Sequence, residues 1–100
     1  MKFILLLLVS LSIYSNPISK DCTFKGKKLA GRIKIVSHAA DFTVLVRQYA
    51  ADLNVKISQG SLKDCGEWQF VESGENFRIQ IVNHAPDFSI KFVHSMPGLP

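Results

Sequence analysis

Two copies of a His-x-x-Asp sequence are the residues of this chain whose types and spacing could do chemistry. His38 and Asp41 form the first copy, and His84 and Asp87 form the second. Imidazole nitrogens and carboxylate oxygens are common zinc ligands, so two copies related by an approximate two-fold axis could hold one metal ion. Duplication of a structural turn explains the same pattern without a metal. We therefore predict no metal site and no cofactor, and we keep metal binding through these pairs as an alternative function.

Sequence motifs for enzyme catalysis are missing. The chain has no Gly-rich phosphate loop, no Gly-x-Ser-x-Gly and no His-Glu-x-x-His. His38 and Asp41 could form half of a catalytic triad, but no recognisable turn presents a serine or cysteine nucleophile. We predict that the protein has no catalytic residues and is not an enzyme. A hydrolase acting on envelope polymer is a further alternative, for which the sequence offers no residue set.

The start of the chain is typical of a secretory signal peptide. A lysine at position 2 precedes an apolar run over residues 3–13, and small residues follow. The run is too short for a stable transmembrane helix, which needs about 20 apolar residues. We expect cleavage after Ser15, so that residues 1–15 are the signal peptide and the protein is exported to the periplasm or secreted.

The two cysteines, Cys22 and Cys65, are expected to form a disulfide, because an exported chain passes into an oxidising compartment. Neither cysteine belongs to a Cys-x-x-Cys motif or has an adjacent base, so neither has the setting of a reactive thiol. In the chain-entropy treatment, closing a loop of about 43 residues stabilises the fold by about 4 kcal/mol.

Composition limits the chain to one small, core-forming domain. Of its 100 residues, 47% are hydrophobic and 20% are charged, which argues against disorder. We expect a short leader over residues 16–21 and a folded domain over residues 22–100. The net charge of +4 is well below that of a dedicated nucleic-acid binder.

Half of the twelve basic residues lie between positions 20 and 34, where only Asp21 opposes them. Such a stretch could bind an anionic polymer or a membrane surface weakly. Phe24 is the only aromatic residue within it, so no specific nucleic-acid binding is expected. The alternative is a solvated strand edge that prevents aggregation. The basic residues are Lys20, Lys25, Lys27, Lys28, Arg32 and Lys34.

The chain repeats itself at two scales. Residues 32–42 match residues 78–88 along their whole length, which indicates two related halves. Within the halves, an apolar-x-apolar triplet rich in Ile, Val, Phe and Trp occurs six times. Such alternation predicts short half-buried strands. The predicted core consists of the triplet ends: Ile33, Ile35, Val44, Val46, Val55, Ile57, Trp68, Phe70, Ile79, Ile81, Ile90 and Phe92.

A turn residue follows each apolar triplet, after a polar or small stretch. It is Asp or Asn in five units and Gly in the last one, and an apolar residue follows it. A short carboxylate can accept a hydrogen bond from a backbone N–H two residues further on, so we expect these side chains to fix local turns. The following apolar residue should then turn back into the core. The pairs are Asp41-Phe42, Asp52-Leu53, Asp64-Cys65, Asn76-Phe77, Asp87-Phe88 and Gly98-Leu99.

The repeated Ile-Val-x-His-x-x-Asp-Phe and Ala-Ala-Asp-Leu units resemble the small bacterial septoil (7(1)) knot domain family, over residues 22–99. The resemblance implies a backbone wound into a seven-crossing torus knot, in a family with no established biochemical activity. Residues 95–99 depart from the repeated turn, which leaves the path of the C-terminus undetermined by the resemblance.

The predicted fold is an all-β or mostly β single domain of two pseudo-repeats. Its alternatives are an unknotted β-solenoid-like domain or a sandwich. The predicted function is that of an exported, non-catalytic structural or binding module.

Overall fold

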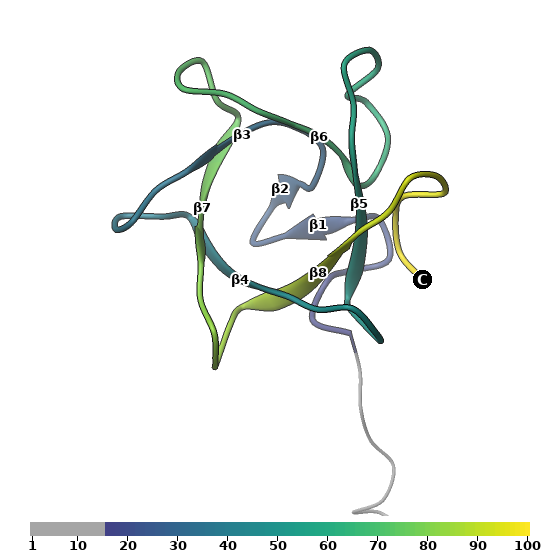
Figure 1. Ribbon diagram of the computed structural model, residues 1–100, viewed down its shortest axis with the longest axis horizontal. Helices are drawn as coiled ribbons and strands as arrows, with labels where there is room; N and C mark the ends of the chain where they lie inside the picture. The colour runs from purple at the N-terminus through teal and green to yellow at the C-terminus, as the bar shows by residue number, and fades with distance from the viewer. Residues whose placement is uncertain (1–15) are drawn as a thin grey trace, which may run out of the picture.

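The computed structural model describes residues 16–100, which form eight β-strands and no helix (Figure 1). Strands β1 (Thr23–Phe24) and β2 (Lys27–Lys28) pair as an antiparallel hairpin. The remaining strands are β3 (Gly31–Ile35), β4 (Phe42–Val46), β5 (Leu53–Ile57), β6 (Glu67–Phe70), β7 (Phe77–Ile81) and β8 (Phe88–Phe92). The predicted small all-β domain is confirmed, whereas the predicted signal peptide lies outside the described residues. Within residues 16–100, no helix is long and apolar enough to cross a membrane.

Strands β3 to β8 close into a barrel in the order β3-β6-β5-β8-β4-β7, and every neighbouring pair is parallel. The chain always advances in the same direction around the barrel. The β5–β6 connection leads to the adjacent strand, whereas each of the other four skips one strand. Parallel strands in open sheets usually need a crossover of a dozen or more residues. Here residues 36–41 suffice between β3 and β4, which lie two places apart in the closed barrel.

Each strand is staggered by two residues relative to its neighbour. Ile33 pairs with Phe77, and Ile79 pairs with Phe42; the same step recurs around the barrel. Residues two apart point to the same side of a strand, so this stagger brings equivalent residues of all six strands to one level. The middle level is fully buried, with 0% exposure at Ile33, Val44, Val55, Trp68, Ile79 and Ile90.

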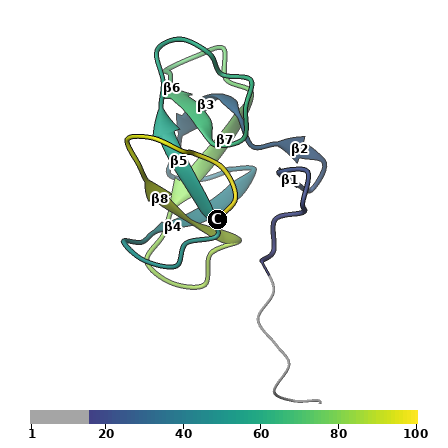
Figure 2. The same cartoon turned by 90° about the vertical axis from the view of Figure 1, so that its right-hand side faces the viewer.

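The level at the N-terminal ends of the barrel strands is also buried. Its apolar residues follow the turn residues in the sequence, as predicted, and are at most 2% exposed: Phe42, Leu53, Phe77 and Phe88. The β1–β2 hairpin packs on this level, and Figure 2 shows it to one side of the barrel. The Phe24 ring makes edge contacts with Phe42 and Phe88, both with ring centroids 5.3 Å apart. This end of the core is therefore closed.

The prediction of a buried core at all twelve triplet ends is wrong for the last level. Five of these side chains are between 39% and 47% exposed: Ile35, Val46, Ile57, Ile81 and Phe92. The sixth, Phe70, is partly buried against the core. They end their strands on the same face as the buried residues, but no hairpin covers this end of the barrel among residues 16–100. Apolar–polar alternation along a strand predicts which side chains face the barrel interior. It does not reveal which of them lie at an uncovered end of the barrel.

Four of the six turn residues tie neighbouring strands together instead of closing their own turns, which corrects the local interpretation for Asp41, Asp52, Asn76 and Asp87. The Arg78 N–H donates to the Asp41 carboxylate at 2.9 Å, and the Asp41 N–H donates to the Arg78 carbonyl at 2.9 Å. In these four connections the turn residue lies against the second residue of a neighbouring strand. The same pair of bonds joins Asp52 to Ser89, Asn76 to Arg32, and Asp87 to Thr43.

We call these four pairs of hydrogen bonds strand clamps, and we expect a more buried clamp to contribute more to the free energy of unfolding. Asp52 is only 7% exposed and accepts hydrogen bonds from both the N–H and the hydroxyl of Ser89. We expect Asp52→Ala to lower the free energy of unfolding by about 2 kcal/mol and Asp41→Ala, on the exposed clamp, by about 1 kcal/mol, because unpaired buried donors cost more than solvated ones. Urea unfolding measures both values. Equal losses would contradict this ranking.

Candidate functional site

The two His-x-x-Asp copies do not assemble a metal centre among the described residues. His38 and His84 are exposed, in the β3–β4 and β7–β8 loops, which leave the barrel in different directions (Figure 1). Each imidazole Nδ1 is within hydrogen-bond distance of the side chain before it. Asp41 and Asp87 are held by backbone N–H groups of neighbouring strands. Over residues 16–100, no group of three or more His, Cys, Asp or Glu side chains is placed to hold a metal ion.

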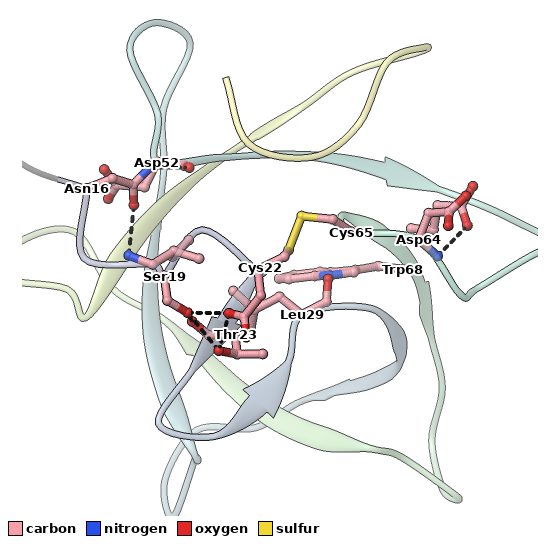
Figure 3. Close-up of a disulfide and its surroundings, with 12 residues drawn as sticks. Asn16, Ser19, Cys22, Thr23, Leu29, Asp52, Asp64, Cys65 and Trp68 are labelled. Carbon is pink, nitrogen blue, oxygen red and sulfur yellow. Dashed lines mark hydrogen bonds between the residues drawn. A yellow bond between two sulfur atoms is a disulfide. The ribbon is translucent and has the colours of Figure 1, made fainter.

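The predicted disulfide between Cys22 and Cys65 is confirmed, with Cα atoms 5.8 Å apart (Figure 3). It joins the segment that leads into the hairpin to the loop between β5 and β6. Beside it, the Trp68 indole N–H donates to the Leu29 carbonyl at 3.0 Å. Leu29 is fully buried, and Cys22 is only 3% exposed. The two cysteines therefore have a structural position, at the closed end of the barrel.

The basic stretch is divided by the fold. Lys25, Lys27 and Lys28 are exposed on the β1–β2 hairpin, and the Lys25 ammonium lies 5.5 Å from the centre of the Phe24 ring. Next to the hairpin, hydroxyl groups of Ser19 and Thr23 hydrogen-bond to the Asp21 carboxylate and lower its pKa. Arg32 and Lys34 lie elsewhere, on β3, and the Arg32 guanidinium donates to the Gly74 carbonyl. The predicted basic stretch is therefore divided between the hairpin and β3.

The open end of the barrel, here called the mouth, carries the last residue of each barrel strand: Ile35, Val46, Ile57, Phe70, Ile81 and Phe92. Phe70 and Phe92 belong to β6 and β8, which are separated by β5, yet their ring centroids are 6.4 Å apart. Their side chains therefore project inward, over the end of the barrel. The Phe70 ring also contacts Trp68 of the middle level, at 6.3 Å. The mouth is thus the exposed last level of the core.

Cations flank the mouth, and we call Lys34, Arg47, Lys56 and Lys91 the rim. Each lies directly before or after a mouth residue in the sequence. Two shallow depressions join mouth and rim. One, of about 180 Å³, is lined by Lys34, Ile35, Phe70, Val71 and Glu72. The other, of about 260 Å³, is lined by Val46, Arg47, Gln48, Lys91 and Phe92.

A wider groove of about 460 Å³ lies on the outer surface along β4 and β8. Its polar lining residues are Arg47, which also flanks the mouth, and Asp52, Asp87 and Ser89, which already take part in strand clamps. Their hydrogen bonds hold the barrel together. The mouth, whose apolar atoms are exposed, is therefore the better candidate for a functional site.

Most of the chain matches a known domain family. The family model described as the 7(1) septoil knot domain matches residues 26–100. The chain belongs to the septoil knot domain family. This confirms the resemblance drawn from the repeated units, and the one-directional winding of β3 to β8 agrees with a septoil knot domain. No curated protein matches the chain.

The match begins at Gly26. Cys22 and Phe24, which help to close one end of this septoil knot domain, therefore lie before the matched segment. The mouth and the rim lie entirely within it. The candidate site is thus built on the part of the chain that the family model covers.

Proposed function

We propose that this septoil knot domain is an exported, non-catalytic binding module that engages an apolar surface through its mouth. The observation that carries the proposal is the exposure of the mouth. Its five most exposed side chains, at 39–47% each, present on the order of 400 Å² of surface. Exposed apolar patches of a few hundred Å² on small proteins often mark interaction sites.

The contrast between the two ends of the barrel supports this proposal. At the closed end, a hairpin covers the aromatic residues, and the Cys22–Cys65 disulfide secures the segment beside it. The mouth carries equally apolar side chains without such a cover among residues 16–100. A purely structural role would favour polar side chains on strand ends that face water.

The rigidity of the barrel and the disulfide both support the proposed role as an exported binding module. Parallel pairing around a closed barrel, the strand clamps and the disulfide all hold the mouth residues in fixed positions, which lowers the entropy cost of binding. The disulfide is consistent with an oxidising compartment outside the cytoplasm.

An uncharged apolar fluorophore, N-phenyl-1-naphthylamine, tests whether the mouth binds. We expect saturable fluorescence enhancement with the native protein. The double variant Ile35→Ser/Ile81→Ser should bind about tenfold more weakly, because it removes apolar contact area from two strands of the mouth. Tyr49→Ser is the matched control, since Tyr49 is 77% exposed on a loop and should leave binding unchanged.

Thermal unfolding checks that each variant is folded before the probe is added. Native protein without saturable binding would contradict the proposed function. Equal binding by the native protein and the folded double variant would also contradict it, because the probe would then bind elsewhere.

A further inference from the structure

We propose that the mouth and the rim together form a docking face for an anionic lipid bilayer, with the mouth side chains inserted among the lipids and the rim cations at the phosphate groups. This inference rests on the proposed function and names its target.

The first support is the position of the apolar side chains. They stand at one end of the barrel, on the last residues of six strands that run in the same direction. A bilayer can receive such a group at the boundary between headgroups and acyl chains, where apolar area and electrostatic attraction both add to binding. The contact between the Phe70 and Phe92 rings keeps these two side chains over the barrel end.

The second support is the charge of the rim. Lys34, Lys56 and Lys91 each occupy the last position but one of a strand, and all three are partly buried. Their aliphatic stems can therefore lie beside the mouth while the ammonium groups reach outward to phosphates. Arg47 adds a fourth cation. Among residues 16–100, Glu72 is the only acidic residue that lines the two depressions at the mouth. In the β6–β7 loop, the hydrogen bond from Arg78 lowers the pKa of Glu75, and the charge of Lys34 also helps to lower it.

A second copy of the chain fits this face less well. In a two-fold contact the same patch is used on both sides, so the rim cations of one copy would approach those of the other. The exposed apolar area is also small for a protein partner, because roughly 400 Å² is about half of the ~800 Å² that each side buries in a standard interface.

The β1–β2 hairpin at the closed end is the alternative protein surface that could bind a membrane. It carries Lys25, Lys27 and Lys28, but its Phe24 ring packs on Phe42 and Phe88 of the core. Binding through this end would therefore be electrostatic alone. The two ends offer the same number of lysines for substitution, which makes a matched comparison available.

Co-sedimentation with vesicles tests the inference, with equal parts phosphatidylcholine and phosphatidylglycerol against phosphatidylcholine alone. Native protein should bind the anionic vesicles and release them as salt rises. Lys34→Gln/Lys56→Gln/Lys91→Gln should weaken binding roughly a hundredfold, at about one kcal/mol per lysine. Lys25→Gln/Lys27→Gln/Lys28→Gln, at the closed end, should change binding less than about threefold.

The apolar part is tested with Ile35→Ser/Ile81→Ser, which should also weaken vesicle binding about tenfold. If this double variant proves unfolded, the two lysine variants, whose changes lie outside the core, still decide the result. Loss of binding with the hairpin variant alone would overturn the inference in favour of the closed end.

Two further results would also overturn it. The first is a native protein that binds the apolar fluorophore at the mouth but no anionic vesicle, a result that leaves the proposed function intact. The second is a native dimer in sedimentation equilibrium that Ile35→Ser/Ile81→Ser dissociates, since the mouth would then be occupied by a second copy.

Discussion

Replacing both cysteines, as Cys22→Ala/Cys65→Ala, is expected to lower the free energy of unfolding by about 4 kcal/mol. The disulfide joins residues 43 positions apart. Its loss releases that loop in the unfolded chain, and it also frees the segment next to the hairpin from the β5–β6 loop. For a domain of this size, such a loss is a large part of a total stability of about 5–15 kcal/mol. Guanidinium unfolding of both proteins measures it.

Reduction of the native protein by a thiol provides the control, and it should reproduce the stability of the double variant. Serine substitution of the exposed Tyr49 should leave stability nearly unchanged. A loss below about 1 kcal/mol would contradict the prediction and indicate that packing of Phe24 and Leu29 suffices to hold the closed end.

Alanine in place of Gly66 is expected to cost about 3–4 kcal/mol, the second largest effect. Gly66 has a φ of +82°, and a Cβ there would collide with the backbone carbonyl oxygen of Asn54 and crowd the backbone N–H of Gly98. Neither group can move freely, because Asn54 and Gly98 are hydrogen-bonded to each other. The measurement is again the free energy of unfolding.

Gly74 offers a matched control for this substitution. Its φ is +78°, but a Cβ there would meet nothing within 4 Å. Gly74→Ala should therefore cost only the left-handed backbone penalty, about 1 kcal/mol. Similar losses at the two positions would contradict a steric role for Gly66.

Much of the core could be predicted from local patterns. Alternation around Val44 and Ile79 indicated strands with one inward face, and the apolar residues after the turn aspartates, such as Phe42, were expected to turn into the core. The disulfide followed from two cysteines in a chain with a predicted export signal. These predictions depend on residues that lie close together in the sequence, or on there being only one partner available.

The order of the strands could not be predicted in the same way. The six apolar triplets are so alike that no pairing is favoured by side-chain pattern alone. Asp41 illustrates the consequence: its carboxylate was expected to bond within its own turn, but the winding places it against Arg78, 37 residues away. The resemblance to the septoil knot family implied a knotted winding, but it did not give the order of the strands.

The candidate site was missed for a related reason. Ile35 and Ile81 have the same alternation as the buried Ile33 and Ile79, so the sequence pattern assigns all four to the core. Their exposure depends on which end of the barrel the hairpin covers. Three of the four flanking cations were visible as the polar middle residues of triplets, but the relation of all four to a common rim appears only when the strands are placed side by side.

The central claim, that the mouth is the binding face, is tested most directly by methyl NMR of isoleucine-labelled protein with a nitroxide-bearing apolar probe. Ile35, Ile57 and Ile81 lie at the mouth, whereas Ile18 is buried in the core cluster with the residues that close the other end. We predict strong relaxation of the three mouth methyl groups and little effect on Ile18. Relaxation of Ile18 with the mouth signals unchanged, or no relaxation of any methyl group, would contradict the claim.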